Sequence, residues 1–485
     1  MRVTLGDLEI ASRQNRDFRM HMNRFAKIAD NANLVFVFDH VGRSGNGFVL
    51  GIFDQHPQVA TSHWVHYTYS YLVTEFGMAD ELDSKAAYDF IIEKSYFQFV
   101  FKDLDDAIKA HIYKAGGDPE TPIDRSLCRK VFGQIVLAND KISRRNLVLA
   151  AYYAILVGMG RDTSELKYVM VADSVSLRTE NVMDGFSGKV MDAALHDFPE
   201  MKAISLVRDP RAMFASNRHQ FVNVLGNMYG VKFGNFFHKL KQLASCDFQM
   251  YSTVWPFWLT YGAATTRCIY KLRRNHLNRF RVLKNEDLNL AFQPTMELVS
   301  EWLGIDKMPE WGEQNYVPTS MGKPWKGTGA YNSRYQSKTN GMLKNDSTDV
   351  AEKSVGPNAH VTNRWRKKMA LHESRIIECL FREEMADLGY NKVESAVSED
   401  SFLRCLLKPF NGELPTFSWL KRGFSEGMRE AVNRVFYVFV FPIFYVVSRC
   451  MIFKLYKDGF FENISSQEHV IKASKFLSPL HRVDN

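Results

Sequence analysis

The chain has 485 residues, 46% of them apolar and 24% charged, a composition that indicates a folded protein with a large core and excludes a mainly disordered chain. Its formal net charge is +8, and residues 401–485 hold 12 Lys or Arg against 7 Asp or Glu, an excess of +5. The rest of the chain is close to neutral, so we expect no nucleic-acid partner.

The first part of the chain is polar and mixed in charge, with neither the apolar stretch nor the cleavage site of a secretory signal peptide. We expect residues 1–30 to form an N-terminal helical extension of a cytoplasmic protein. Six cysteines are scattered without a CxxC pair, which favours reduced thiols over disulfides or zinc ligands. The sequence also has no His, Cys or Asp pattern typical of a metal site, so it predicts no metal cofactor.

A glycine-rich loop follows the first apolar run. Residues 34–38 have the composition of a buried parallel strand, and residues 47–55 fit a helix. Between a strand and a helix, loop amides and the helix N-terminus can bind an anion. The lysine of a Walker loop is missing because Gly47 is followed by Phe48, and Arg43 is the only cation in the loop. This pattern indicates a nucleotide with phosphate or sulfate groups and argues against ordinary ATP or GTP hydrolysis.

The alternation of strands and helices predicts the fold class. Further apolar runs at 167–172, 202–207 and 279–283 favour strands, with helical patterns between them, and residues 77–160 are mostly helical. We therefore expect an α/β fold: a three-layer parallel β-sheet flanked by helices, of the P-loop nucleotide-binding type. Residues 306–360 are rich in Gly, Asn, Ser and Lys, and a loop of this length is usually functional or disordered.

A second anion-binding pattern lies at the end of the third expected strand. Arg208 ends that strand, Pro210 suits the first position of a helix, and Ser216 follows about two turns later. An Arg fork and a Ser hydroxyl in this arrangement can both reach one phosphate group. Taken alone, such a string would more often form a surface ion pair. Its place after the third strand, with a phosphate loop after the first, favours a binding site.

Together, the segments GRSGNG, with His56-Pro57 after its helix, and LVRDPRAMFAS resemble the two nucleotide-binding motifs of the sulfotransferase family. The resemblance implies that residues 31–392 form a catalytic domain whose sulfonate donor is 3′-phosphoadenylyl sulfate (PAPS). Within this domain, we expect residues 77–160 to shape the substrate side and residues 306–360 to close over the nucleotide.

The resemblance also assigns roles to individual residues. It implies that Arg43 and the loop around it hold the 5′-phosphosulfate, and that Arg208 and Ser216 hold the 3′-phosphate. The implied nucleotide-binding residues are Arg43, Ser44, Gly45, Asn46, Gly47, Phe48, Arg208, Ser216, Lys326 and Ser333.

The chain departs from the family pattern at two places. Asn46-Gly47 stand where the family has Thr-Thr, so Gly47 offers only its backbone to the donor. Members resembling the tyrosine-protein sulfotransferases have a catalytic Glu after the His-Pro step, where this chain has His63 and His66. A histidine can take a proton from an acceptor hydroxyl at neutral pH. We therefore expect His63 or His66 to act as the base and Arg43 to neutralise charge on the bridging oxygen. The alternative is that both histidines are structural.

Beyond the catalytic domain the resemblance ends, and we expect residues 393–485 to form a helical, membrane-associated segment. Residues 435–448 are an uncharged run of 14 residues, whereas a membrane span needs about 20. Basic residues on both sides, with abundant Phe and Tyr, favour a segment at 435–456 that lies on an anionic membrane surface. The alternative is a helix pair that packs on the catalytic domain or on a second subunit of a homodimer.

The sequence thus predicts a PAPS-dependent sulfotransferase that transfers a sulfonate group to a hydroxyl acceptor, with a lipid or membrane-associated acceptor favoured if the C-terminal segment binds a membrane. The corresponding localisation is cytoplasmic and peripheral at the membrane. The alternative is a non-catalytic nucleotide-binding or membrane scaffold protein with a degenerate sulfotransferase fold, motivated by the altered Thr-Thr pair and the absent Glu. Nothing in the sequence identifies the acceptor as a sugar, a peptide or a lipid.

Overall fold

A five-stranded parallel sheet, in the order β2-β5-β1-β6-β7, forms the centre of the molecule. Its strands are β1 (Asn33–Asp39), β2 (Val59–Ala60), β5 (Tyr168–Asp173), β6 (Lys202–Val207) and β7 (Phe280–Lys284). The expected α/β class, with a parallel sheet flanked by helices, is confirmed. Strand β2 was not expected, because two residues are too few to show a periodic pattern. The computed structural model describes residues 5–39, 42–177, 179–180, 186–225, 231–246, 256–276, 278–327, 356–391 and 399–461.

Strand β1 is the middle strand and is buried on both faces. Its residue Val37 pairs with Ala172 of β5 on one side and with Ile204 of β6 on the other. Phe36 and Phe38 enter one hydrophobic core, whereas Val37 enters a second core on the opposite face. This burial on both sides explains why the strand is an unbroken apolar run.

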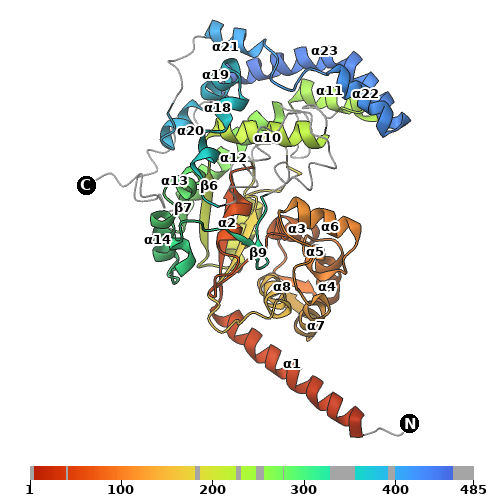
Figure 1. Ribbon diagram of the computed structural model, residues 1–485, viewed down its shortest axis with the longest axis vertical. Coiled ribbons are helices and arrows are strands. Elements are labelled where there is room, and N and C mark those ends of the chain that lie inside the picture. The colour runs from red at the N-terminus through yellow and green to blue at the C-terminus, as the bar shows by residue number, and fades with distance from the viewer. Residues whose placement is uncertain are drawn as a thin grey trace, which may run out of the picture.

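A helical region between β2 and β5 lies beside the sheet (Figure 1) and contributes most of the first core. Within it, β3 (Glu81–Asp83) pairs antiparallel with β4 (Lys141–Ser143), a short ribbon that the helical patterns did not predict. The helices of this region are α3 (Thr68–Phe76), α4 (Ser84–Glu93), α5 (Gln98–Phe101), α6 (Asp106–Lys114), α7 (Arg125–Val136) and α8 (Arg144–Gly158).

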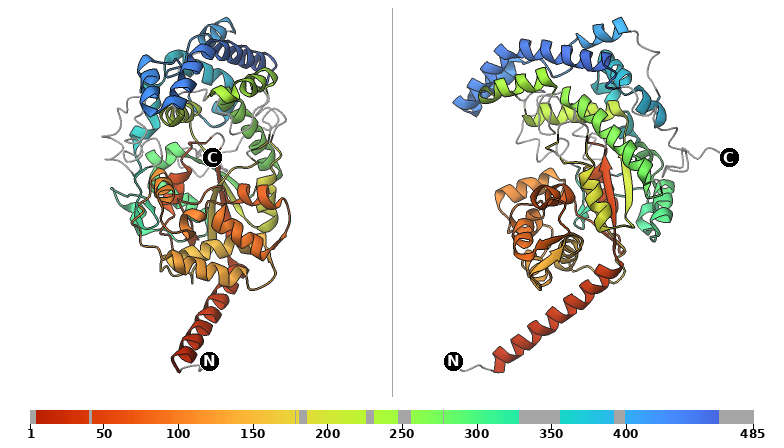
Figure 2. Two further views of the ribbon diagram at one scale, coloured as in Figure 1. Left: turned by 90° about the vertical axis from the view of Figure 1, so that its right-hand side faces the viewer. Right: turned by 180° about the vertical axis from the view of Figure 1, so that it is seen from behind.

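The second core, on the other face of β1, is built with α2 (Asn46–Ile52) and α14 (Phe292–Leu303). Helix α1 (Leu5–Asn31) projects from the amino edge of the sheet, and Figure 2 shows that its N-terminal end stands away from the body. The other elements up to residue 324 are α9 (Lys189–Asp197), α10 (Pro210–Leu225), η1 (Phe233–Asn235), α11 (Phe236–Ser245), α12 (Pro256–Asn275), α13 (Asn285–Leu290), η2 (Pro309–Gly312), β8 (Thr319–Ser320) and β9 (Lys323–Pro324).

The C-terminal helices lie at the opposite end of the molecule from α1 (Figure 1). They share a hydrophobic core with α10, in which the ring of Phe214 lies 5.4 Å from that of Phe410. The helix that follows β6 is thus packed between the sheet and the C-terminal layer. These helices are α17 (Ala359–Asn363), α18 (Trp365–Lys368), α19 (Leu371–Leu380), α20 (Arg382–Asp387), α21 (Glu399–Leu406), α22 (Phe417–Glu426) and α23 (Met428–Lys457).

Candidate functional site

The loop between β1 and α2 makes a tight turn over its described residues, 42–45. Gly42, Arg43 and Gly45 all have positive φ, of 83°, 66° and 113°. Arg43 is a bulky residue in the left-handed region, a costly conformation that is found most often at functional sites. Gly45 is the N-cap of α2, and a Cβ at this position would collide with the side-chain amide of Asn285. The glycine is therefore required both by its backbone and by its neighbour.

The two anion-binding motifs meet in space. The Arg43 Nε donates to Ser216 Oγ at 3.4 Å, and the Arg208 Nη1 donates to the Arg43 carbonyl at 3.2 Å. Asn217, next to Ser216 on α10, reaches the Gly42 carbonyl with its Nδ2 at 3.5 Å. Since β1 and β6 are parallel neighbours, their carboxyl ends bring these residues to one edge of the sheet. Two guanidinium groups and a hydroxyl therefore converge where an anionic ligand is expected.

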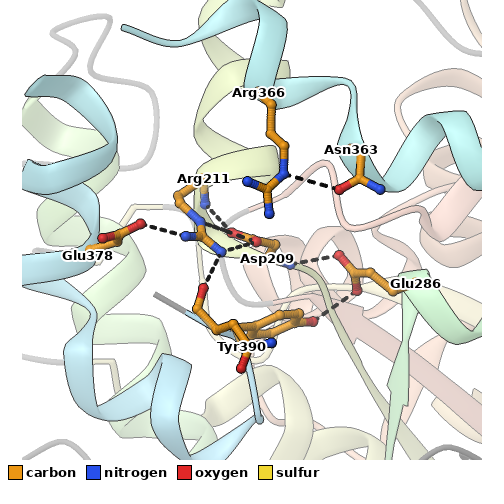
Figure 3. Close-up of polar contacts among 8 residues, drawn as sticks. Asp209, Arg211, Glu286, Asn363, Arg366, Glu378 and Tyr390 are labelled. Carbon is orange, nitrogen blue, oxygen red and sulfur yellow. Dashed lines mark hydrogen bonds and ion pairs between the residues drawn. The ribbon is translucent and has the colours of Figure 1, made fainter. Parts of the chain in front are cut away.

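Arg208 is nearly buried, and its surroundings fix its position. Its Nη2 donates to the Val361 carbonyl at 3.2 Å. The carboxylate of Glu286, at the start of α13, accepts from the Asp209 amide at 3.0 Å and from the Tyr390 hydroxyl at 2.9 Å (Figure 3). Burial raises the pKa of Glu286, and the Asp209 amide and the Arg208 charge oppose this rise. Glu286 thus braces the strand end that carries Arg208.

A second brace holds the start of α10. Arg211 lies between two carboxylates, 2.6 Å from Asp209 Oδ2 and 2.5 Å from Glu378 Oε1, and it donates to the Asn391 carbonyl at 2.9 Å (Figure 3). Its guanidinium group stacks 4.3 Å from the centre of the Trp365 ring. These contacts join the start of α10 to the C-terminal helices, so Arg211 orients the motif.

Lys114, at the end of α6, is a cation that the sequence patterns did not single out. Burial lowers the pKa of Lys114, and the Arg43 charge lowers it further. Two cations held near one another favour an anion between them. The turn that follows Lys114 contains the pair Gly116-Gly117. A Cβ on Gly116 would collide with the Gly327 carbonyl. That pair lets the turn after α6 approach the segment beyond β9 closely.

His63 is fully buried. A Cβ on Gly51 of α2 would lie 2.8 Å from the His63 Cε1, and the Trp325 ring lies 5.5 Å from the imidazole. Among the described residues, neither ring nitrogen has a partner at hydrogen-bonding geometry. Burial lowers the pKa of His63 to about 4, with opposing contributions from Asp54 and the Gly47 carbonyl. The ring is thus neutral at physiological pH and has no exposed surface for an acceptor.

His66 is half-buried and belongs to an aromatic cluster. Its ring lies 6.1 Å from Tyr67 and 6.3 Å from Tyr96, and Tyr96 also lies 5.3 Å from Tyr71 and from His111. Tyr67 has a positive φ of 59°, a second strained non-glycine residue near the sheet edge.

A buried carboxylate anchors the segment that carries His66. Asp173, at the carboxyl end of β5, accepts from the amides of Tyr69 at 2.5 Å and Ser70 at 3.1 Å. Burial raises the pKa of Asp173 to about 6. These bonds fix the start of α3, and with it the position of His66, relative to the sheet.

The remaining expected nucleotide-binding residues have different surroundings. The Ser44 hydroxyl is buried and donates to the Met213 sulfur at 3.0 Å, so this side chain packs the loop onto α10. Asn46 begins α2, and its buried Oδ1 has no partner among the described residues. Lys326 pairs with Asp118 at 3.6 Å. Ser333 lies outside the described residues.

Phe48 of α2 contacts Trp325, which follows the β8–β9 hairpin. The two rings lie 6.0 Å apart, and the Trp325 indole also donates to the Ala115 carbonyl at 3.0 Å. The segment that follows the hairpin is therefore attached both to the loop helix and to the turn after α6. Sequence reasoning missed Trp325 because the surrounding segment has no periodic pattern.

A parallel sheet with a glycine-rich loop and converging arginines at its carboxyl edge is an arrangement typical of anion- and nucleotide-binding α/β proteins. Residues 164–389 match the family model described as the sulfotransferase domain. The resemblance to the sulfotransferase family is therefore confirmed over these residues, which include the second motif at 208–216. The match includes β5, β6 and β7, whereas β1 and its loop precede it. Because β1 pairs with both β5 and β6, the loop that follows β1 lies at the edge of the same sheet.

No curated protein matches the chain. Among solved structures, the sulfotransferase domain from the curacin biosynthetic pathway is similar, with 12% identity and a TM-score of 0.38, over 74% of this chain and 98% of that chain. The sulfotransferase domain from the Synechococcus PCC 7002 olefin synthase has 14% identity and a TM-score of 0.32, over 69% of this chain and 88% of that chain.

Proposed function

We propose that this protein transfers the sulfonate group of PAPS to a hydroxyl-bearing acceptor. The observation that carries the proposal is the convergence of Arg43, Arg208 and Ser216 at the carboxyl edge of β1 and β6. A sulfotransferase domain implies PAPS-dependent activity, and these residues offer the cations and the hydroxyl that a nucleotide with two phosphate positions requires.

Each residue has a distinct role in the proposal. Arg43 and the amides of the loop hold the 5′-phosphosulfate, while Arg208 and Ser216 hold the 3′-phosphate. Lys114 supplies a second positive charge near Arg43. During transfer, the bond between sulfur and the bridging oxygen breaks, and negative charge grows on the phosphate that leaves. Fixed cations at that place stabilise the transition state without reorganisation of solvent.

His66 is the proposed general base. Of the two histidines expected from the sequence, His63 has no exposed surface, whereas His66 is partly exposed beside Tyr67 and Tyr96. A neutral imidazole accepts the proton of the acceptor hydroxyl as oxygen attacks sulfur. The aromatic surroundings suit a hydroxyl on an apolar or ring-shaped body, which includes lipids.

Incubation with sulfur-labelled PAPS tests the proposal. The wild-type protein is expected to label a component of a fractionated cell extract, and His66→Ala is expected to abolish transfer while binding of 3′,5′-bisphosphoadenosine persists. His276→Ala is the matched control, because His276 lies at the opposite edge of the sheet, before β7, stacked on Phe280. Nucleotide binding without transfer to any fraction would instead indicate a scaffold protein.

A further inference from the structure

Helix α23 has an outer face without a single charge over most of its length. Its exposed residues Met428, Val432, Phe439, Ile443 and Val446 recur at spacings of four, seven, four and three, which places them on one side of the helix. Met428 is 78% exposed and Phe439 is 76% exposed. Among the described residues, α23 is the one helix long and apolar enough to cross a membrane by length and composition.

The opposite face of α23 is attached to the protein. Tyr437 and Phe444 enter the core that also holds Phe214 of α10. The two arginines that flank the uncharged run, Arg434 and Arg449, are buried on this side. Arg449 forms a two-pronged ion pair with Glu413, at 2.5 and 2.6 Å.

Arg434, the other arginine, pairs with Glu430 at 3.1 Å and also with Glu426. Both cations are therefore neutralised within the protein. The pair of Arg449 with Glu413 is buried on both sides, so a membrane-spanning arrangement that removed α23 from the protein would break it and leave an uncompensated charge. The pairing of these arginines therefore favours α23 lying along the surface of the protein.

The elements packed on α23 expose further large apolar residues. Phe417 of α22 and Phe237 of α11 are each 81% exposed, and Phe233 of η1 is also exposed while it contacts the ring of Phe436 at 4.9 Å. We call the outer side of α23 the apolar face; these phenylalanines are exposed on elements that pack against the same helix. Exposed aromatic residues in such number mark an interaction surface rather than an ordinary solvated one.

Basic side chains flank this face at both ends of α23. Lys421 and Arg429 are exposed near its beginning, and Lys454 and Lys457 are exposed near its end. An apolar strip bordered by lysine and arginine matches the interface of an anionic bilayer, with lipid tails facing the strip and headgroups facing the cations. A second copy of the chain would present the same positive rims, and these would repel each other.

We propose that the apolar face docks this protein on the surface of an anionic membrane, with α23 lying in the plane of the interface. Because α10, which carries Ser216, packs between the sheet and α23 (Figure 1), docking would hold the candidate site at the membrane side of the molecule. This proposal goes beyond the transfer reaction and does not depend on it.

Co-sedimentation with phosphatidylcholine vesicles, with and without phosphatidylglycerol, tests the proposal on the full chain. The wild-type protein is expected to bind, more strongly when phosphatidylglycerol is present. The double variant Phe439→Asp/Val446→Asp is expected to have a partition coefficient about tenfold or more lower than that of the wild type. In the wild type, the Phe439 and Val446 side chains leave water when the protein binds the membrane, and this transfer is favourable. Leu137→Asp is the matched control, because Leu137 is an exposed leucine beyond the end of α7, and it should bind like the wild type.

A second variant covers the case in which the first one fails to fold. Lys454→Glu/Lys457→Glu leaves the apolar strip intact and is expected to abolish the preference for phosphatidylglycerol, as is high salt. Wild-type protein that stays in the supernatant with both kinds of vesicle would overturn the proposal. It would equally be overturned if sedimentation velocity found a dimer that the Phe439→Asp/Val446→Asp substitutions dissociate, because a second copy would then cover the face.

Discussion

Replacing His63 by glutamine tests the environment that the fold creates beside the loop helix. The imidazole has no exposed surface and is enclosed by Gly51 and Trp325. Burial lowers the pKa of His63 to about 4, against the opposing effects of Asp54 and the Gly47 carbonyl. In the unfolded chain the same ring has an ordinary pKa of about 6.5. The proton therefore binds the unfolded state first as the pH falls.

The sign and size of the effect follow from this difference. Because the unfolded state binds more protons between about pH 6.5 and pH 4, the free energy of unfolding decreases as the pH falls through that range. The two pKa values correspond to about 3 kcal/mol in total, of which about 2 kcal/mol is lost by about pH 5. Glutamine is neutral throughout, so His63→Gln has no such loss.

Urea unfolding of both proteins at about pH 8 and about pH 5 measures the effect. The advantage of the wild type over His63→Gln should shrink by about 2 kcal/mol at the lower pH. Other buried groups titrate in both proteins and cancel, including Asp173, whose pKa burial raises to about 6, and His111, whose pKa burial lowers to about 4. An advantage that is the same at both pH values would refute the reasoning and restore His63 as a candidate base.

Three further substitutions test the frame of the site. Gly45→Ala should weaken binding of 3′,5′-bisphosphoadenosine in a calorimetric titration and lower stability by about 1–3 kcal/mol, because of its positive φ and the collision with Asn285; unchanged binding would contradict this. Arg211→Met should cost about 3–5 kcal/mol in urea unfolding, since it removes the buried cation that pairs with both Asp209 and Glu378, and a neutral result would argue against this brace. Lys114→Ala should raise the KM for PAPS by about tenfold in the labelled-donor assay, whereas Lys109→Ala on the same helix should not; equal effects would remove Lys114 from the site.

The fold was largely predictable because its central strands are buried on both faces. The runs that became β1, β5, β6 and β7 are unbroken apolar segments, and such segments carry a strong signal. The pairing of β3 with β4 was not predictable from the pattern, because three-residue strands show no period.

The site was predictable only where it depends on local motifs. The convergence of Arg43, Arg208 and Ser216 could be predicted because each follows a strand at a defined distance in the sequence. Lys114 and Trp325 could not be assigned, because their positions depend on how separate segments pack around α2. Such long-range packing leaves no periodic or motif signal in a single sequence.

The C-terminal segment shows the same limit. Its uncharged run of 14 residues suggested a helix too short to span a membrane, whereas the structure extends this helix to 30 residues, through Pro442 and both flanking arginines. Arg434 and Arg449 fit within it because each pairs with glutamate on the inner face. The sequence indicated which residues are apolar, and only the packing shows which of them face outward.

The most direct test of the central claim is calorimetric titration of 3′,5′-bisphosphoadenosine into the wild type, Arg208→Ala and Arg43→Ala. If the two arginines converge on the nucleotide, the wild type binds, and each variant loses about tenfold or more in affinity while its thermal transition persists. Arg279→Ala, at the amino edge of β7, should bind like the wild type. Equally tight binding by Arg208→Ala would contradict the assignment of this edge of the sheet as the nucleotide site.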